Sequence, residues 1–347
     1  MDTIGLDLHK RQSQLCIIAE DGSISERRIV TSRERFTAVL GNCSPARILL
    51  EASTESEWVA QHLESLGHEV IVADPNYAPM YASRTRRVKT DKRDARALAE
   101  ALRLGAYRVA HRVSAERRHV RAELAVREAL VRTRTRYISL AKALVRRDGL
   151  RVAGSEAEKV AKRIADLDLS DSLASELMPL FQVMAPINEQ IDAADRRITQ
   201  MSKNDPEVAL LTTAPSIGPI TASAIVATVD DITRFQSAHQ FEAFLGLVPG
   251  ERSSGEKRRV GKITKAGNSR VRYLLVEAAW RIRRSKSEET VALRSWALLI
   301  AARRGKRIAV VALARRLAGI LYAMWRDNSP YNGAMLRMPR PTVAKAS

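Results

Sequence analysis

The chain has 347 residues, a length that suits two domains, and its composition, 45% hydrophobic and 28% charged, is that of an ordinary folded protein. No run of about eighteen apolar residues and no basic-then-apolar leader is recognisable, so a soluble, cytoplasmic protein without a membrane span is expected. Two cysteines are too few for a disulfide framework or a cysteine zinc cluster. The formal net charge of +19 predicts a polyanionic partner, nucleic acid first.

The first hundred residues alternate between strand and helix patterns. Residues 3–9, 12–19 and 25–30 are expected to form strands that begin an antiparallel sheet. Helical spacing over residues 32–40 and 56–66 then alternates with short strands at 47–51 and 68–73. This order predicts an α/β domain in which helices pack on a mixed sheet.

Four carboxylates occupy informative positions in this domain. Asp7 lies within the strand-like run TIGLDLHK, and Glu51 ends the strand RILLE. Thr90 can cap a helix over residues 91–104, so Asp91 and Asp94 project from one face of its first turn. Because strands deplete Asp, Asp7 is either the water-facing end of an edge strand or a ligand for a positive group.

Four carboxylates of this kind suit Mg²⁺ or Mn²⁺, which activate nucleophiles in phosphoryl transfer. Acids in a first helical turn also stabilise the helix dipole, and acids at element ends are usually only solvated. Spacing alone leaves both interpretations open. Cations gather beside the acids and predict a phosphate-binding surface made of Arg84, Arg86, Arg87, Lys89, Lys92 and Arg93.

Two long helical patterns follow. Residues 113–147 approximate a seven-residue apolar repeat with a basic outer face, and a second pattern runs from Asp171, where Pro179 and Pro186 should kink or divide the helix. We expect an antiparallel helical stalk, either a plain connector or a coiled-coil surface for oligomerisation. The repeat in the first helix consists of Val120, Leu124, Leu130, Tyr137, Leu140 and Leu144.

A second compact unit begins after Asn204-Asp205-Pro206. The run LLTTAPSIGPITASAIVAT resembles a helix-hairpin-helix, in which Gly218 would let a phosphate approach the backbone at a helix start. An ordinary interhelical turn fits equally well. A helix is expected over residues 235–247, three closing helices over 272–284, 290–302 and 308–325, and a loose tail from 328.

Residues 251–272, ERSSGEKRRVGKITKAGNSRVR, are expected to form a flexible basic loop. The run has no GxxxxGK[ST] pattern, which argues against a nucleotide P-loop. A serine hydroxyl here, from Ser253 or Ser254, can attack a phosphodiester if a base or metal activates it, although serine in a polar loop is ordinarily a turn residue. The candidate phosphate contacts are Lys257, Arg258, Arg259, Lys262, Lys265, Arg270 and Arg272.

Several of these blocks resemble one known family. GLDLHK, LLEAS and KTDKRDARALA are similar to the three N-terminal blocks of the DEDD-type insertion-sequence transposases, the group that includes the Piv and MooV invertases. The resemblance implies a ribonuclease H-like, Holliday-junction-resolvase-like N-terminal domain. It places the family's four acidic metal ligands on Asp7, Glu51, Asp91 and Asp94.

The resemblance continues in the C-terminal half, where FLGLVPGERSSG and ITKAGNSRVRYLLVEAA are similar to the family's transposase domain. It implies that Ser254 is the nucleophilic serine, with Ser253 and Ser269 as alternatives. Thr264 stands where the family often has serine before its Lys-x-Gly, which argues against a required serine there.

The expected function is therefore a DNA transposase or recombinase of an insertion element. The resemblance implies double-stranded DNA substrates, a guide RNA encoded by the element and a homo-oligomer, dimer or tetramer. A Mg²⁺-dependent structure-selective nuclease and a non-catalytic nucleic-acid scaffold are the alternatives. The expected domains are residues 1–110, a helical stalk over 111–204, a C-terminal transposase domain over 205–328 and a tail over 329–347.

Overall fold

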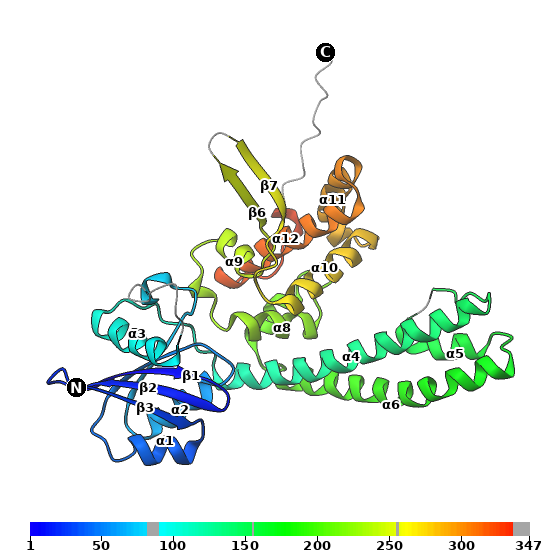
Figure 1. The fold of residues 1–347 in the computed structure, drawn as a ribbon. Coiled ribbons are helices and arrows are strands. Elements are labelled where there is room, and N and C mark those ends of the chain that lie inside the picture. Colours follow the sequence, from blue (N-terminus) through cyan, green and yellow to red (C-terminus); the bar gives the residue numbers. More distant parts are fainter. Residues whose placement is uncertain (82–89, 155, 255–256, 336–347) are drawn as a thin grey trace. The chain divides into compact units, whose positions relative to one another are not determined.

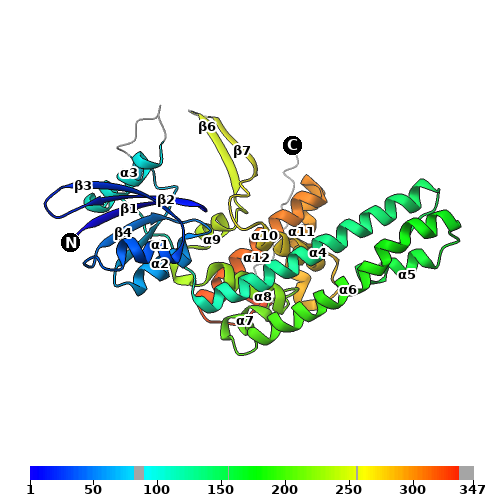
Figure 2. The same ribbon diagram turned by 60° about the horizontal axis from the view of Figure 1, so that its bottom comes forward.

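The computed structural model describes residues 1–81, 90–154, 156–254 and 257–335, with only the backbone described for 252–254, 257–260 and 335. The chain forms two compact units, Met1–Val113 and Ser114–Ser347, each treated by itself below. Figure 1 and Figure 2 show the elements of each unit from two directions.

The N-terminal unit is built on one five-stranded mixed sheet in the order β3-β2-β1-β4-β5. The antiparallel start and the parallel β4 and β5 confirm the expected α/β domain. Its elements are β1 (Thr3–Leu8), β2 (Gln12–Ile18), β3 (Ile24–Val30), α1 (Arg33–Leu40), β4 (Arg47–Glu51), α2 (Ser56–Ser65), β5 (Glu69–Ala73), the 3₁₀ turn Ala78–Tyr81 and α3 (Asp91–Leu104).

The helices cover both faces of this sheet (Figure 1). Ile4, Leu6 and Leu8 of β1 join one buried cluster with residues of α1 and α2. Since side chains alternate along a strand, Gly5 and Asp7 face the opposite side, where α3 packs. The face of β1 that carries the candidate metal ligand is therefore the face under α3.

The C-terminal unit begins with the predicted stalk. The helices α4 (Ala115–Arg147) and α6 (Asp171–Met201) are antiparallel, as the ion pairs Arg127–Asp195 and Arg147–Glu176 show. A short helix, α5 (Val160–Ala165), packs at the end where they are joined. The antiparallel stalk is thus confirmed.

The predicted seam of α4 is only partly correct. Val120 and Leu124 are buried, but Leu140 is 48% exposed, and Ile138, Ala141 and Val145 are buried instead. The predicted 3.5-residue spacing of apolar residues is present, but two apolar stripes lie side by side on α4. The spacing does not indicate which of the two stripes faces α6.

The division of α6 at its prolines is wrong, because the helix runs unbroken through Pro179 and Pro186. Both prolines lie on its exposed face, where water can bind the backbone carbonyls that each proline leaves without an N–H donor. The opposite face keeps its buried repeat through Leu177, Met184 and Ile191.

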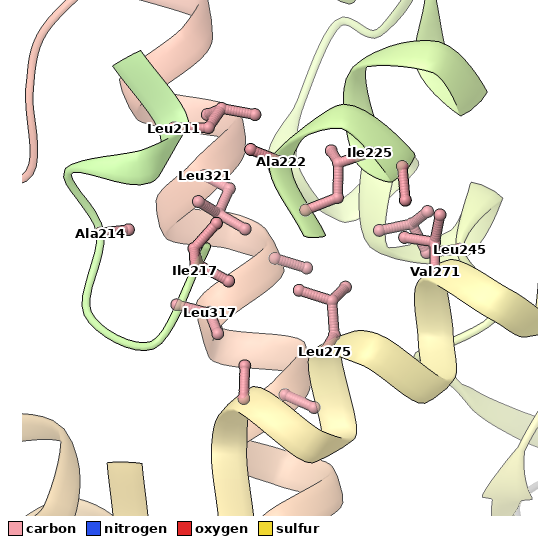
Figure 3. Packing of buried hydrophobic residues seen from close by; sticks show 14 of the residues in the cluster. Leu211, Ala214, Ile217, Ala222, Ile225, Leu245, Val271, Leu275, Leu317 and Leu321 are labelled. Atoms are coloured by element: carbon pink, nitrogen blue, oxygen red, sulfur yellow. The ribbon is translucent and has the colours of Figure 1, made fainter. Parts of the chain in front are cut away.

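The rest of the unit is a helical core. Its elements are α7 (Pro206–Thr212), α8 (Pro219–Val229), α9 (Ala238–Phe244), β6 (Pro249–Ser254), β7 (Lys257–Ile263), α10 (Ser269–Arg284), α11 (Val291–Arg304) and α12 (Lys306–Arg326). Figure 3 shows Ile217, in the loop between α7 and α8, packed beside Leu317 and Leu321 of α12. The buried side chain of Ile217 therefore holds the SIGPI turn against α12.

The expected flexible loop over 251–272 is wrong in its first half, because β6 and β7 pair as an antiparallel ribbon with Pro249 opposite Ile263. The sequence shows no alternation of apolar and polar residues there, which is the usual strand signal. The described start of the tail is also less loose than expected, since the Tyr331 N–H donates to Thr213 Oγ1 at 3.0 Å.

Among the described residues, α12 alone has the length and mean hydropathy of a membrane span, although Arg315 and Arg316 interrupt its apolar run. More than half of its most apolar window is buried within the unit. Leu313, Leu317 and Leu321 belong to the main hydrophobic cluster, so its hydropathy matches its place at the centre of a core.

Candidate functional site

The N-terminal site is centred on Asp7 at the end of the middle strand. Asp7 is only 8% exposed although it carries a carboxylate. Glu51 ends the neighbouring strand β4, and the parallel register pairs Leu6 with Leu50, so the two acids follow at the same edge of the sheet. The predicted positions of both acids at strand ends are confirmed.

Asp91 and Asp94 come from the first turn of α3, which Thr90 caps by accepting a hydrogen bond from the Arg93 N–H at 3.4 Å. Asp94 is 3% exposed, while Asp91 remains open to solvent. The two acids therefore share the start of one helix but differ in environment.

Gly5 allows α3 to lie directly on β1. A Cβ atom at this position would stand 2.0 Å from the Ala95 carbonyl oxygen and 2.4 Å from the Ala99 backbone nitrogen. Any side chain would push α3 away from the strand, so this glycine sets how close the acids of α3 come to Asp7. Sequence reasoning missed this role, although the glycine lies in the block GLDLHK.

Three of the four acids line one pocket. The pocket has a volume of about 320 Å³ and contains Asp7, Glu51 and Asp94 together with His9, Ser53 and Tyr81. The Tyr81 hydroxyl donates a hydrogen bond to Glu51 Oε1.

Asp91 is joined to this group through His9. The His9 Nε2 atom lies 3.3 Å from Asp7 Oδ2 and 3.5 Å from Asp91 Oδ1. One ligand atom from each of Asp7, His9 and Asp91 falls within 4.8 Å of the others, a spacing that suits a single metal ion. His9 was not predicted, but it follows Asp7 by two residues and so shares its face of the sheet.

The pKa of Asp7 reflects its burial and its closeness to the other acids. The pKa of Asp7 is raised to about 6, chiefly by burial; His9 lowers it, and Asp94, Glu51 and Asp91 contribute to the rise. Asp7 Oδ2 is buried and makes no hydrogen bond among the described residues, although His9 Nε2 lies 3.3 Å from it. A buried carboxylate oxygen without a hydrogen bond, beside three more carboxylates, fits a hard divalent cation such as Mg²⁺ or Mn²⁺.

The cations predicted beside the acids are partly described. Lys92 Nζ lies 3.5 Å from Glu26, and Arg28, which the sequence did not single out, lies 3.8 Å from Asp91. Arg93 also interacts with another residue of the protein. The remaining predicted cations lie outside the described residues: Arg84, Arg86, Arg87 and Lys89.

The candidate residues of the C-terminal unit lie on and after the β6–β7 ribbon. Ser253 and Ser254 end β6, and the register pairs Ser254 with Lys257 and Ser253 with Arg258. Arg259 and Lys262 follow on β7, and Lys265 has a positive φ of 57° in the turn that leads to α10. Side chains are described from Gly261 onward, and Lys262 is exposed.

Three candidates at the start of α10 are placed in full. Ser269 is its first residue, after Asn268 caps the helix. Arg270 pairs with Glu128, and Arg272 Nη1 donates to the carbonyls of Leu245 at 3.0 Å and Gly267 at 3.1 Å. Arg272 thus holds the turn before α10.

Gly218 is the N-cap of α8 with extended backbone, φ −89° and ψ 174°, and a Cβ atom there would meet open space. The fold therefore does not need a glycine at this position for its own packing. The prediction that Gly218 admits a phosphate stays a prediction.

Comparison with known proteins gives matches in both halves. A transposase model of the DEDD IS110 type matches residues 4–147, and a model described as the transposase IS116/IS110/IS902 family matches residues 208–293. Both halves of the chain are therefore similar to DEDD transposases of the IS110/IS116/IS902 type. The first match includes all four acids and His9, and the second includes the β6–β7 ribbon and α10.

Relatives of this protein match over nearly the whole chain. A probable family 20 transposase of Pseudomonas aeruginosa is 28% identical over 95% of this chain and 98% of its own length. The transposase for insertion sequence element IS1111A of Coxiella burnetii is 28% identical over 94% and 90%. The transposase for IS1328 of Yersinia enterocolitica is 28% identical over 95% and 98%.

Proposed function

We propose that this chain is the transposase of an insertion element, which cuts and rejoins double-stranded DNA with a divalent metal site in its N-terminal unit and a serine nucleophile in its C-terminal unit. The observation that carries the proposal is the convergence of Asp7, Glu51, Asp91 and Asp94 around the buried Oδ2 of Asp7, which makes no hydrogen bond among the described residues. A ribonuclease H-like fold is part of the proposal, and the strand order supports it.

The candidate metal ligands would have different roles. Asp7 and Glu51, fixed on neighbouring strands, and Asp94, fixed at the start of α3, would hold the ion, and the open Asp91 would complete its ligands with His9 beside it. The bound cation would supply charge that stabilises the developing negative charge on a phosphate. Tyr81 orients Glu51 through its hydrogen bond.

Ser254 would act as the nucleophile. Its Oγ attacks the phosphorus atom, the P–O3′ bond breaks, the serine proton goes to a base and the departing 3′ oxygen takes up a proton. The resulting phosphoserine ester keeps the bond energy, so a 3′ hydroxyl of a second strand can attack it and release the serine without ATP. Ser253 and Ser269 are the alternative nucleophiles, and a site shared between subunits of a homo-oligomer is part of this proposal.

The cations of the chain would bind phosphates. The net charge of +19 supports contact with DNA and with a guide RNA transcribed from the element, and the cytoplasm is the expected location. Lys257, Arg258, Arg259 and Lys262 lie along β7, and Lys265 lies in the turn after it.

Substitution of the acids and the serine tests the mechanism. Asp94→Asn and Ser254→Ala should each abolish recombination of an element-end substrate while DNA binding persists. Glu34→Gln is a matched control, because Glu34 is an exposed acid on α1 outside the pocket. Full recombination in both site variants would refute the proposal.

Trapping the covalent intermediate separates the mechanisms. A protein–DNA adduct should form with the original protein and with Ser269→Ala, and should be absent from Ser254→Ala. If Ser254→Ala still cleaves DNA in the presence of Mg²⁺ and leaves free ends, the protein is a nuclease that uses water. If binding requires no metal and no variant loses any activity, the protein is a scaffold.

A further inference from the structure

A groove in the C-terminal unit is not explained by the metal site or by the serine. It lies between the first half of α4, the start of α8 and the first turns of α10, elements that neighbour one another in Figures 1 and 2. Two adjoining pockets of about 470 and 710 Å³ form it and share Leu124, Glu128, Arg132, Ser269 and Arg270. Pockets of this size commonly hold organic ligands.

The floor of the groove is apolar, and an aromatic ring stands open at its side. Leu124, Val131, Ile220 and Leu274 line the smaller pocket. Tyr273 lines it too and is 61% exposed, the most exposed aromatic side chain among the large exposed hydrophobic residues that the structure describes. An aromatic ring left open beside an apolar floor offers a flat surface for another flat ring.

The mouth of the groove is positively charged. Glu128 accepts from Arg132 on one carboxylate oxygen and from Arg270 on the other, so one acid is shared between two arginines. The Arg132 side chain is 73% exposed, whereas Glu128 is 22% exposed. Arg132 is therefore free to swing toward a phosphate while Arg270 keeps Glu128 neutralised.

Tyr273 keeps a neutral ring in this setting. Burial of its hydroxyl region and the nearby Glu277 raise the pKa of Tyr273, which favours the protonated phenol. A neutral ring does not repel a polynucleotide, and stacking needs only the ring face.

We propose that this groove binds an unpaired base of a single-stranded polynucleotide, with Tyr273 stacked on the base and Arg132 on the adjoining phosphate. The inference rests on the proposed function, because a recombinase handles unpaired strands. A duplex keeps its bases stacked inside the helix and presents its phosphates, and an apolar floor does not favour binding of phosphates. The low aromatic content of the chain fits a single stacking site.

Binding of labelled single-stranded oligothymidylate and of a labelled duplex to the full-length protein tests the idea. Tyr273→Ala should weaken single-strand binding roughly tenfold and leave duplex binding unchanged, while Tyr273→Phe should retain both. Arg132→Ala should weaken single-strand binding. Its control, Arg136→Ala, removes an exposed arginine of the same helix that does not line the groove, and should have no such effect.

Photocrosslinking locates the base. Single-stranded DNA that carries 5-iodouracil should crosslink to the α10 peptide that contains Tyr273. An equal loss of duplex and single-strand binding in Tyr273→Ala, or a crosslink elsewhere, would overturn the inference. A change of oligomeric state in Tyr273→Ala without loss of single-strand binding would show that the groove holds a protein partner. The adduct assay on Ser254 is unaffected by these outcomes, so the proposed function is judged separately.

Discussion

Replacing Asp7 with Asn should stabilise the metal-free N-terminal unit at high pH and not at low pH. The folded state raises the pKa of Asp7 from 3.8 to about 6, so the folded state holds this proton more tightly than the unfolded state does. The contribution of Asp7 to stability is then fully present below pH 3.8 and is lost as the pH rises through about 6.

The magnitude follows from the two pKa values. Their difference corresponds to roughly 3 kcal/mol of unfolding free energy at about pH 8, which is an upper limit because the Asn amide must also be buried. Asp7→Asn removes the charge and nearly keeps the shape, so it should recover part of this amount in EDTA at about pH 8 and almost none near pH 4.

Denaturant unfolding read by pulsed hydrogen exchange of β1 and β4 peptides measures the N-terminal unit within the full chain. Glu34→Gln, at an exposed position, should not stabilise the unit at either pH. If Asp7→Asn destabilises the unit equally at both pH values, the folded protein does not disfavour the ionised form of Asp7, and the reasoning fails.

Three further predictions use denaturant unfolding read by hydrogen exchange, on β1 and β4 peptides for the N-terminal unit and on α4 peptides for the stalk. Saturating Mg²⁺ at high pH should stabilise the original N-terminal unit by about 2.7 kcal/mol at a hundredfold excess over Kd and should stabilise Asp7→Asn much less; equal stabilisation of both would contradict the metal site. Gly5→Ala should cost about 1–3 kcal/mol and weaken Mg²⁺ binding, because its Cβ collides with α3, whereas Gly154→Ala, with open space around it, should be neutral. Arg134→Ala, which removes the buried partner of Glu158 and Asn188, should destabilise the stalk by about 1–3 kcal/mol, and a change no larger than in Arg136→Ala would show that the polar contact is dispensable.

The stalk contains a buried charge that local sequence patterns do not predict. The length of α4 and its 3.5-residue repeat were evident from the sequence, but Arg134 is buried at a seam position where apolar residues are expected. It is accommodated because Glu158, in the short 3₁₀ turn before α5, and Asn188, on α6, supply its acceptors. Such partners come from distant segments, so no window of the sequence contains them.

The β6–β7 ribbon is a second case. Its residues are mostly polar and basic, and strand prediction depends on apolar alternation, so the run appeared to be a loop. Pairing of the two backbones, which does not depend on side-chain hydropathy, made the ribbon. The candidate serines therefore end a strand.

The sequence by itself determined the element types of the N-terminal unit and the helix start at Thr90, because caps, strand ends and helical spacing are encoded within a few residues. It also singled out the four acids, whose role as metal ligands stays a prediction. Tertiary structure alone decided that Gly5 brings α3 onto β1, that His9 bridges Asp7 and Asp91, and that α4, α8 and α10 enclose a groove beside Tyr273. These features depend on distances between segments far apart in the chain, and such distances are set by packing of the whole unit.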